Sequence, residues 1–159
     1  MESEENFITN DFEAVSNEGS YDFFTCFETL EHCQPQEQTR ILEVAHNQLK
    51  ADGKMIISVP IEIGPISLLK NFMRRNTRDA SRPDFTLSNV IKAALYQPTT
   101  WLRDTLEYPG HFGWDHRKLE ELINKSSLFR IEKKRYSPIG FLPSIWINSQ
   151  VFYVLNKIV

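Results

Sequence analysis

Glutamate and histidine side chains gather where an aromatic segment of the sequence ends. Glu28 and Glu31 stand three residues apart, and His32 follows directly. A further histidine, His111, lies in the segment Gly110-His-Phe-Gly-Trp114. Between them, carboxylates and imidazoles bind divalent cations such as Mg²⁺, Mn²⁺ or Zn²⁺, and an imidazole also takes up a proton near neutral pH. These two segments are therefore the first candidates for a site that performs chemistry.

Charge is distributed unevenly along the 159 residues. The chain has 18 Lys and Arg and 21 Asp and Glu, which gives a net charge of −3. Ten acids precede the first basic residue, Arg40, so this acidic head carries −10 and the remainder, with 18 bases and 11 acids, carries +7. A net charge near zero argues against DNA or general nucleic-acid binding.

Several common motifs are not found in the sequence, and we expect no targeting signal. No two of the six glycines form a Gly-x-Gly turn, which excludes a dinucleotide fingerprint and a P-loop. The sequence has no run of about 18 apolar residues that would span a membrane. Its acidic start, MESEENF, lacks the apolar segment of a signal peptide. Two cysteines are too few for a disulfide scaffold and are expected to be free thiols, so we expect a cytoplasmic protein.

Apolar patterning predicts a strand–helix–strand unit around the first candidate residues. Tyr21–Phe27 is short and aromatic and is expected to be a buried strand. A proline in the first turn and apolar residues at helical spacing predict a helix over about 35–51, with Gly53 as its left-handed cap. The run Met55–Val59 is typical of a parallel strand covered on both faces. Together these form a βαβ unit.

Prolines divide the segment from about 61 to 113 into short pieces, and we interpret it as a helical insertion with short helices over Ile66–Met73 and Leu87–Leu95. Its basic part, from Lys70 to Arg82, has a net charge of +4 in 13 residues. A basic amphipathic helix here would suit a membrane surface, a lipid-linked phosphate or RNA. We favour the alternative, a solvated face over a buried apolar stripe, so membrane contact is the less favoured interpretation.

The end of the chain predicts one helix and two strands. Asp115 can cap a helix whose apolar face carries Leu119, Leu122 and Ile123. Alternation around Phe129 predicts a half-buried strand, and the apolar run within Gln150–Ile158 predicts a last strand in the middle of the sheet.

Three segments, taken in order, resemble class I S-adenosylmethionine-dependent methyltransferases. They are Tyr21-Asp-Phe-Phe-Thr-Cys-Phe-Glu-Thr-Leu-Glu-His32, Leu49-Lys-Ala-Asp-Gly-Lys-Met-Ile-Ile-Ser-Val-Pro60 and Gly110-His-Phe-Gly-Trp114. In that family an FD-x-V strand runs into the motif E-x-L-E-H. The motif L-K-P-G-G and a strand with S-V-P come next. A G-H element then precedes the last helix. Here the glycine pair is reduced to Asp52-Gly53. The resemblance extends from about Phe7 to the end of the chain.

The resemblance implies a fold and a cofactor. The fold is α/β, a partial Rossmann-like mixed sheet with an antiparallel last strand and flanking helices, and the cofactor is S-adenosylmethionine. Asp11, beside Phe12, would accept from the adenine amine, although an ordinary loop acid is an equal alternative. Cys26 and Phe27 would lie beside the cofactor through backbone contacts.

For Glu28, Glu31, His32 and His111 the resemblance implies alternative roles. Some family members, among them small-RNA 2′-O-methyltransferases and ubiquinone-pathway O-methyltransferases, hold a divalent metal with an E-x-x-E-H of this kind. A simpler role for His32 or His111 is that of general base or substrate contact. Many similar methyltransferases carry E-x-L-E-H with no metal and use the glutamate as a cap or turn residue.

The family's opening strand, Gly-rich turn and helix, and the following strand that ends in a ribose-binding acid, have no counterpart here. A βαβ unit needs about 30 residues, and only ten precede Asp11. We therefore interpret residues 1–159 as a single truncated methyltransferase-like domain with an incomplete cofactor site. The strand at Tyr21 would then have an unpaired edge, which favours a protein partner or self-association.

These expectations lead to one function and one rival. The function is methyl transfer from S-adenosylmethionine to an oxygen or nitrogen of a small molecule, a glycan or a lipid precursor. The rival is a non-catalytic partner or regulatory subunit that pairs with an intact methyltransferase.

Overall fold

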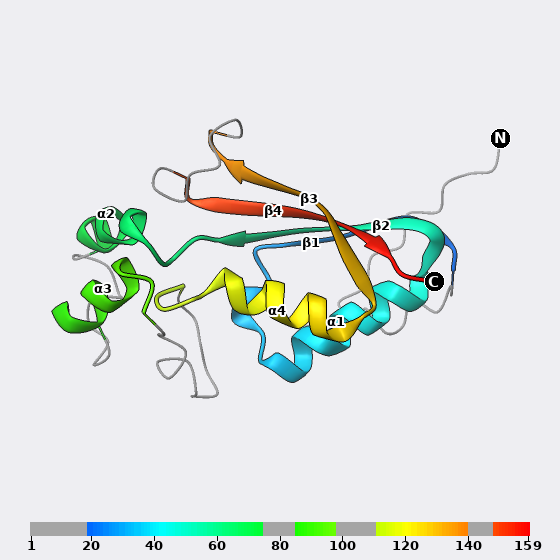
Figure 1. Cartoon of the computed structure of the whole chain (residues 1–159), viewed down its shortest axis with the longest axis horizontal. Coiled ribbons are helices and arrows are strands. Elements are labelled where there is room, and N and C mark those ends of the chain that lie inside the picture. Colours follow the sequence, from blue (N-terminus) through cyan, green and yellow to red (C-terminus); the bar gives the residue numbers. More distant parts are fainter. Residues whose placement is uncertain (1–18, 75–84, 98–110, 140–147) are drawn as a thin grey trace.

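The computed structural model describes residues 19–74, 85–97, 111–139 and 148–159 of the chain (Figure 1). The elements of these ranges, in chain order, are β1 (Tyr21–Phe27), the 3-10 helix η2 (Leu30–His32), α1 (Pro35–Gln48), β2 (Leu49–Pro60), α2 (Pro65–Arg74), α3 (Leu87–Ala94), α4 (His116–Ser126), β3 (Phe129–Ser137) and β4 (Gln150–Lys157).

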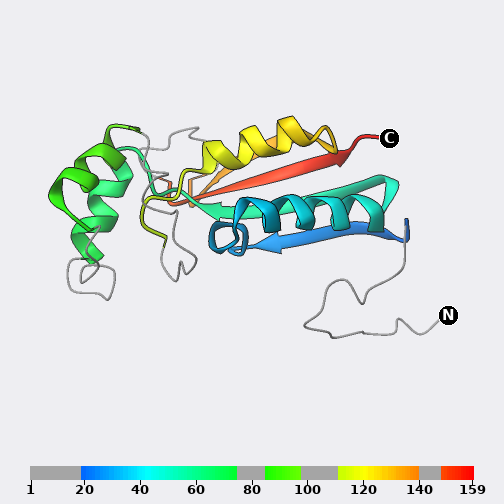
Figure 2. The same cartoon turned by 90° about the horizontal axis from the view of Figure 1, so that it is seen from below.

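The four strands form one mixed sheet in the order β1-β2-β4-β3. β1 and β2 are parallel, whereas β4 runs antiparallel to both of its neighbours. β4 lies inside the sheet, as its apolar run predicts. Helices α1 and α4 both cover the same face of the sheet (Figures 1 and 2). The α/β class, the mixed sheet and the antiparallel last strand expected from the sequence are confirmed.

The hydrophobic core lies between this face and the two helices. Cys26, Ile57 and Tyr153 occupy one register across three adjacent strands, and all three are buried. The helices and strands around them contribute further buried side chains, namely Leu42, Ala45, Met55, Leu119, Ile123 and Leu155. Full burial of a side chain such as Leu or Ile stabilises the fold by about 1.5–3 kcal/mol. Because several such side chains are buried between the helices and the sheet, this layer holds the strands, and therefore their ends, in place.

The prediction that β1 is a buried strand is wrong for most of its residues. Only Cys26 is buried along β1, whereas Phe23 is 62% and Phe27 51% exposed. Alternate side chains of a strand point to opposite faces, so Phe23 and Phe27 lie on the face opposite Cys26. Within the described sheet β1 pairs with β2 alone and forms an edge, which agrees with the open edge expected at Tyr21.

Helix α1 ends earlier than the sequence predicts. It begins at Pro35, as expected, but it stops at Gln48, and Leu49 is already extended with φ −75° and ψ 143°. Gly53 lies within β2 and is not a left-handed cap. A Cβ on Gly53 would meet the Tyr21 carbonyl oxygen at 3.0 Å. The pairing of Tyr21 with Leu49 draws these residues into the sheet, and this long-range ladder outweighs their local helical tendency.

The other predicted helices are present. α2 and α3 match the two short helices expected in the insertion, and Asp115 caps α4 by accepting a hydrogen bond from the backbone N–H of Arg117 at 3.0 Å. Leu119 and Ile123 of α4 are fully buried. No helix in the described ranges is both long and apolar enough to cross a membrane.

The buried apolar stripe expected on α2 is wrong. Ile66 is buried, but the larger apolar side chains that follow are exposed by 47% to 73%, namely Leu68, Leu69, Phe72 and Met73. The polar residues Ser67 and Asn71 are buried in their place. Lys70 of α2 also makes inward contacts. Its Nζ donates to the Ile61 and Ser149 carbonyl oxygens at 2.8 and 3.1 Å and to Glu62 Oε1 at 2.9 Å.

Candidate functional site

The turn after β1 presents Glu31 and His32. Glu28 leaves the strand with a positive φ of 50°, and η2 follows, with its Leu30 side chain fully buried in the core. Gln38 of α1 fixes this turn, because its Nε2 donates to the carbonyl oxygens of Leu30 at 2.8 Å and of Cys33 at 3.2 Å. Anchored on both sides, the turn places a fully buried carboxylate, Glu31, at the carboxyl end of β1.

A second turn, directly before α4, presents His111. Phe112 and Trp114 are buried on either side of Gly113, which adopts a positive φ of 79°. The backbone N–H of Trp114 donates to the His111 carbonyl oxygen at 3.1 Å, which closes the turn. The aromatic pair therefore holds the backbone of this turn while the His111 side chain stays one-third exposed.

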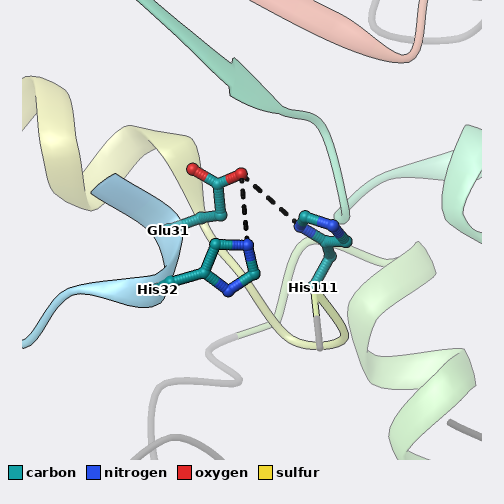
Figure 3. Close-up of side chains that lie close together, drawn as sticks. All are labelled: Glu31, His32 and His111. Atoms are coloured by element: carbon teal, nitrogen blue, oxygen red, sulfur yellow. Dashed lines mark ion pairs between the residues drawn. The ribbon is translucent and has the colours of Figure 1, made fainter. Parts of the chain in front are cut away.

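The two turns bring three predicted residues together (Figure 3). Glu31 Oε1 lies 3.7 Å from His32 Nε2 and 3.6 Å from His111 Nδ1, within ion-pair range when the imidazole is protonated. The two imidazole rings are 4.9 Å apart between centroids. Both imidazoles are about one-third exposed, whereas the carboxylate is fully buried. One buried anion thus faces two solvent-accessible bases.

Glu28, the fourth predicted ligand, lies apart from this cluster. Its Oε1 accepts a hydrogen bond from Ser58 Oγ at 3.4 Å, and its backbone N–H donates to the Ser58 carbonyl oxygen at 3.0 Å. These contacts join the end of β1 to β2. In this geometry Glu28 stabilises the connection between β1 and the turn that follows it.

The donor atoms of the three clustered residues suit a divalent metal. One carboxylate oxygen and two imidazole nitrogens are a ligand set used for zinc and for non-haem iron. The three donor atoms lie within 4.8 Å of one another. Two ligands bound at about 2.2 Å to one ion at a tetrahedral angle lie about 3.6 Å apart, so the most distant donor atoms would have to approach by about 1 Å for all three to bind.

The residues expected at the cofactor are described only in part. Asp11 and Phe12 lie outside the described residues. Cys26 and Phe27 form the carboxyl end of β1, and ligands of α/β folds bind outside the carboxyl ends of the parallel strands. The exposed ring of Phe27 contacts Phe152 edge-to-face at 6.3 Å between centroids. A cofactor contact of Cys26 and Phe27 stays a prediction.

Neither cysteine has the properties of a reactive thiol. Both are free, as expected. Burial raises the pKa of Cys26 to about 11, and burial together with the nearby Glu37 and Glu31 carboxylates raises the pKa of Cys33. Since the thiolate is the reactive form, both shifts disfavour reactivity, and the backbone contact of Cys26 with the cofactor stays a prediction.

Sequence reasoning did not identify the contact of Ser58 with Glu28, or which of the two glutamates faces inward. The spacing E-x-x-E leaves that choice open, because the positive φ of Glu28 rotates the chain between them. The available signal was Leu30 itself, the one apolar residue between Glu28 and His32, whose side chain is fully buried.

No protein-family model matches the sequence, and a search of curated proteins finds no significant match. Solved structures do match. A SAM-dependent methyltransferase from Methanosarcina mazei is 17% identical, with a TM-score of 0.53, over 94% of this chain and 65% of its own. Magnesium protoporphyrin IX methyltransferase from Synechocystis PCC 6803, with bound SAH, is 13% identical, with a TM-score of 0.52, over 96% of this chain and 51% of its own.

A SAM-dependent methyltransferase from Archaeoglobus fulgidus is 12% identical, with a TM-score of 0.53, over 98% of this chain and 69% of its own. This chain thus spans between half and somewhat more than two thirds of the length of these three proteins. At such identities the likeness establishes the fold. The chain has a class I SAM-dependent methyltransferase-like fold, as its motif order predicts.

Proposed function

We propose that this chain takes part in methyl transfer from S-adenosylmethionine to an oxygen or nitrogen of a small molecule, a glycan or a lipid precursor. The observation that carries the proposal is the Glu31–His32–His111 cluster, which lies at the carboxyl end of β1 in a methyltransferase-like fold. When bound, S-adenosylmethionine supplies a sulfonium methyl group that the acceptor atom attacks, and it leaves as a neutral thioether.

In this proposal the histidines remove the proton that an acceptor hydroxyl or amine must lose. An imidazole with a free nitrogen lone pair accepts that proton as the new bond forms. The buried Glu31 carboxylate then stabilises the imidazolium, since its Oε1 lies 3.6 to 3.7 Å from both rings. His111 and His32 are both accessible enough to meet an acceptor, so either serves as the base.

A divalent metal is an alternative use of the same three side chains. Glu31, His32 and His111 would hold it, and its donor set fits Mn²⁺ or Zn²⁺. A bound metal lowers the pKa of a coordinated hydroxyl. Glu31 and the histidines would then orient the acceptor, and the base role would pass to solvent or another group.

A second candidate function, a non-catalytic partner of an intact methyltransferase, is supported by β1. This strand is at the edge of the described sheet and exposes two large aromatic side chains, Phe23 and Phe27. An edge strand offers unpaired backbone donors and acceptors to a second polypeptide. A partner bound there would also cover the exposed aromatic rings.

Calorimetry with S-adenosylmethionine separates the two candidates. For methyl transfer we expect binding heat that is lost when Phe27, beside the expected cofactor position, is replaced in a Phe27→Asp variant. Phe72→Asp is the matched control, because its ring on α2 is at least as exposed. Micromolar binding by this chain would contradict the expected incompleteness of its cofactor site.

The other outcomes are equally informative. Absence of binding heat, together with a dimer or larger species in solution, supports the partner function. Absence of both heat and association would contradict both candidates. A His111→Ala variant that binds the cofactor but transfers no methyl group would support the role of the cluster in the chemistry.

A further inference from the structure

Helices α2 and α3 turn their apolar side chains outward. On α2, Leu68, Leu69, Phe72 and Met73 recur at the spacing of one helix face and are 47%, 57%, 73% and 73% exposed. The inward face carries Ser67 and Asn71, which are 0% and 3% exposed. A helix that packs on a protein core normally buries its apolar face and exposes its polar one, so α2 has the reverse arrangement.

α3 repeats this inversion. Leu87, Ile91 and Leu95, four residues apart, are 77%, 45% and 63% exposed. Asn89 is buried, as are the small residues Ala93 and Ala94. Because two neighbouring helices share the arrangement, it is a property of the pair. We call the seven exposed residues the outer apolar surface: Leu68, Leu69, Phe72, Met73, Leu87, Ile91 and Leu95.

On the inward side of α2, Lys70 is the residue whose contacts hold the helix in this orientation, whereas the buried side-chain atoms of Ser67 and Asn71 have no hydrogen-bond partner among the described residues. Lys70 Nζ donates to three oxygens, including a 2.9 Å ion pair with Glu62, which is 1% exposed. At the start of α2, a Cβ on Gly64 would lie 2.4 Å from Tyr96 Oη, just beyond α3. Rotating α2 to bury its apolar face would break these contacts.

The sequence that directly continues α2 is basic. Residues 74–82 contain four arginines against Asp79, a net charge of +3, in a chain whose total charge is −3. An exposed apolar helix face joined to arginines is typical of segments that lie in the interface of an anionic membrane. Two copies of the chain, paired through this face by a twofold axis, would instead bring two such basic segments together.

We propose that the outer apolar surface docks on the surface of an anionic phospholipid bilayer. The apolar side chains of α2 and α3 enter the boundary between headgroups and acyl chains, and the arginines that follow α2 attract the anionic headgroups. This step does not depend on methyl transfer.

The position of the surface adds a consequence that does rest on the proposed function. α2 and α3 lie together beyond the carboxyl ends of β1 and β2, the end of the sheet that also carries Glu31, His32 and His111 (Figures 1 and 3). Docking would bring this cluster toward the bilayer. The acceptor class it selects is therefore the lipid precursor, reached from the membrane.

Vesicle co-sedimentation tests the docking. Vesicles of phosphatidylcholine with about 30% phosphatidylglycerol are expected to bind the wild-type chain, and binding should weaken as salt screens the headgroups. The variant Leu69→Ser/Phe72→Ser/Met73→Ser should bind at least about tenfold more weakly, because three large apolar side chains no longer enter the bilayer. Phe23→Ser, which removes a comparably exposed ring from β1, is the matched control and should bind as wild type does.

A second readout follows insertion directly. In a Phe72→Trp variant, brominated lipid should quench more fluorescence than it does in the wild type. Absence of wild-type binding to the anionic vesicles would overturn the proposal. Equal binding to pure phosphatidylcholine would overturn the anionic assignment, and a dimer that the triple variant dissociates would replace the bilayer by a second copy of the chain.

The same measurements separate docking from methyl transfer. Vesicle binding without heat from S-adenosylmethionine would support docking and contradict the proposed function. Cofactor heat without vesicle binding would do the reverse.

Discussion

At the scale of single residues, the arrangement of Glu31 decides what the candidate site can do. Its carboxylate is fully buried and lies 3.6 to 3.7 Å from two imidazoles that solvent reaches. A buried charge is costly unless it is paired, so the histidines and the carboxylate are mutually dependent. The same three groups can therefore handle a proton or a metal ion.

The metal alternative predicts a defined response to one substitution. In a titration with Mn²⁺ or Zn²⁺, His32→Ala should weaken binding by more than about tenfold, because loss of a ligand exceeds the effect of losing a supporting group. His46→Ala is the control. It also removes a histidine, but His46 hydrogen-bonds to the Ile158 carbonyl oxygen and is not part of the cluster. Identical curves for wild type and His32→Ala would remove the metal from the proposed function.

The buried histidine His116, which lies outside the candidate site, predicts a pH dependence of stability. His116 is buried at the start of α4, and burial, reinforced by Lys134, lowers its pKa from 6.5 to about 4. The unfolded chain therefore binds a proton between about pH 6.5 and 4 that the folded chain does not. Stability rises with pH wherever the unfolded state binds more protons, so the free energy of unfolding should fall by up to about 3 kcal/mol as the pH drops through this window.

The charged groups around His116 set the limits of that test. Asp115, Glu120, Arg117 and Lys134 all act on it, and Glu120 also accepts hydrogen bonds from Lys134 and from Tyr153 Oη. Glu120, whose pKa is lowered, loses its contribution only at more acidic pH, below about 4.5. Urea unfolding of His116→Gln should lack the loss between pH 6.5 and 4. Parallel curves for wild type and variant would contradict the assignment.

At the scale of elements, the connection from β2 to α2 is held by a largely buried ion pair. Lys70 Nζ lies 2.9 Å from Glu62 Oε1, with side-chain exposures of 18% and 1%. Removal of one partner from such a pair leaves an uncompensated buried charge, whereas replacement of both by apolar groups is often neutral. The pair therefore explains why α2 presents its polar side inward.

Lys70→Met should lower the free energy of unfolding by about 3 kcal/mol, and Lys70→Met/Glu62→Leu should recover most of that loss. Lys118→Met is the matched control, since Lys118 and Glu121 form an ion pair 3.7 Å apart with both side chains about half exposed, and exposed pairs are worth about 0–1 kcal/mol. Equal losses in the single and double variants, measured by urea unfolding, would show that the charge of Glu62 is not what Lys70 compensates.

At the scale of the whole molecule, the described sheet has one face covered by α1 and α4 and an edge at β1 (Figure 2). Phe23 and Phe27 are exposed at that edge, and α2 and α3, which carry the outer apolar surface, lie beyond the carboxyl ends of β1 and β2. These are two separate apolar regions. A partner chain at β1 and a bilayer at α2 and α3 would not compete for the same side chains, because the two proposed contacts share no residue.

Association through β1 should depend on Phe23. Phe23→Lys should raise the dissociation constant of any dimer or larger species by about tenfold or more, since burial of one Phe is worth about 1.5–3 kcal/mol. Sedimentation velocity at increasing protein concentration measures this. Phe72→Lys on α2 is the control and should leave association unchanged, and the reverse ranking would place the contact on α2.

Much of the fold and of the site could be predicted from local patterns. The start of α1 at Pro35, the cap of α4 at Asp115 and the central strands follow from short-range rules. Capping, helical periodicity and unbroken apolar runs all act within a few residues. The candidate residues could also be selected from the sequence, because glutamate and histidine side chains bind metals and transfer protons. Their grouping was not, because Glu31 and His111 are 80 residues apart in the sequence and meet only where η2 and the turn before α4 pack.

The sequence by itself determined the α/β class, the order of elements and the set of groups able to do chemistry. Only the tertiary structure decided that Glu31 joins His32 and His111 while Glu28 contacts Ser58, that β2 takes over residues 49–53 from the preceding helix, and that the apolar sides of α2 and α3 face outward. The physical reason is common to all three. Each depends on which distant segment packs against a residue, and the free energy of that packing outweighs the local preference that a sequence pattern records.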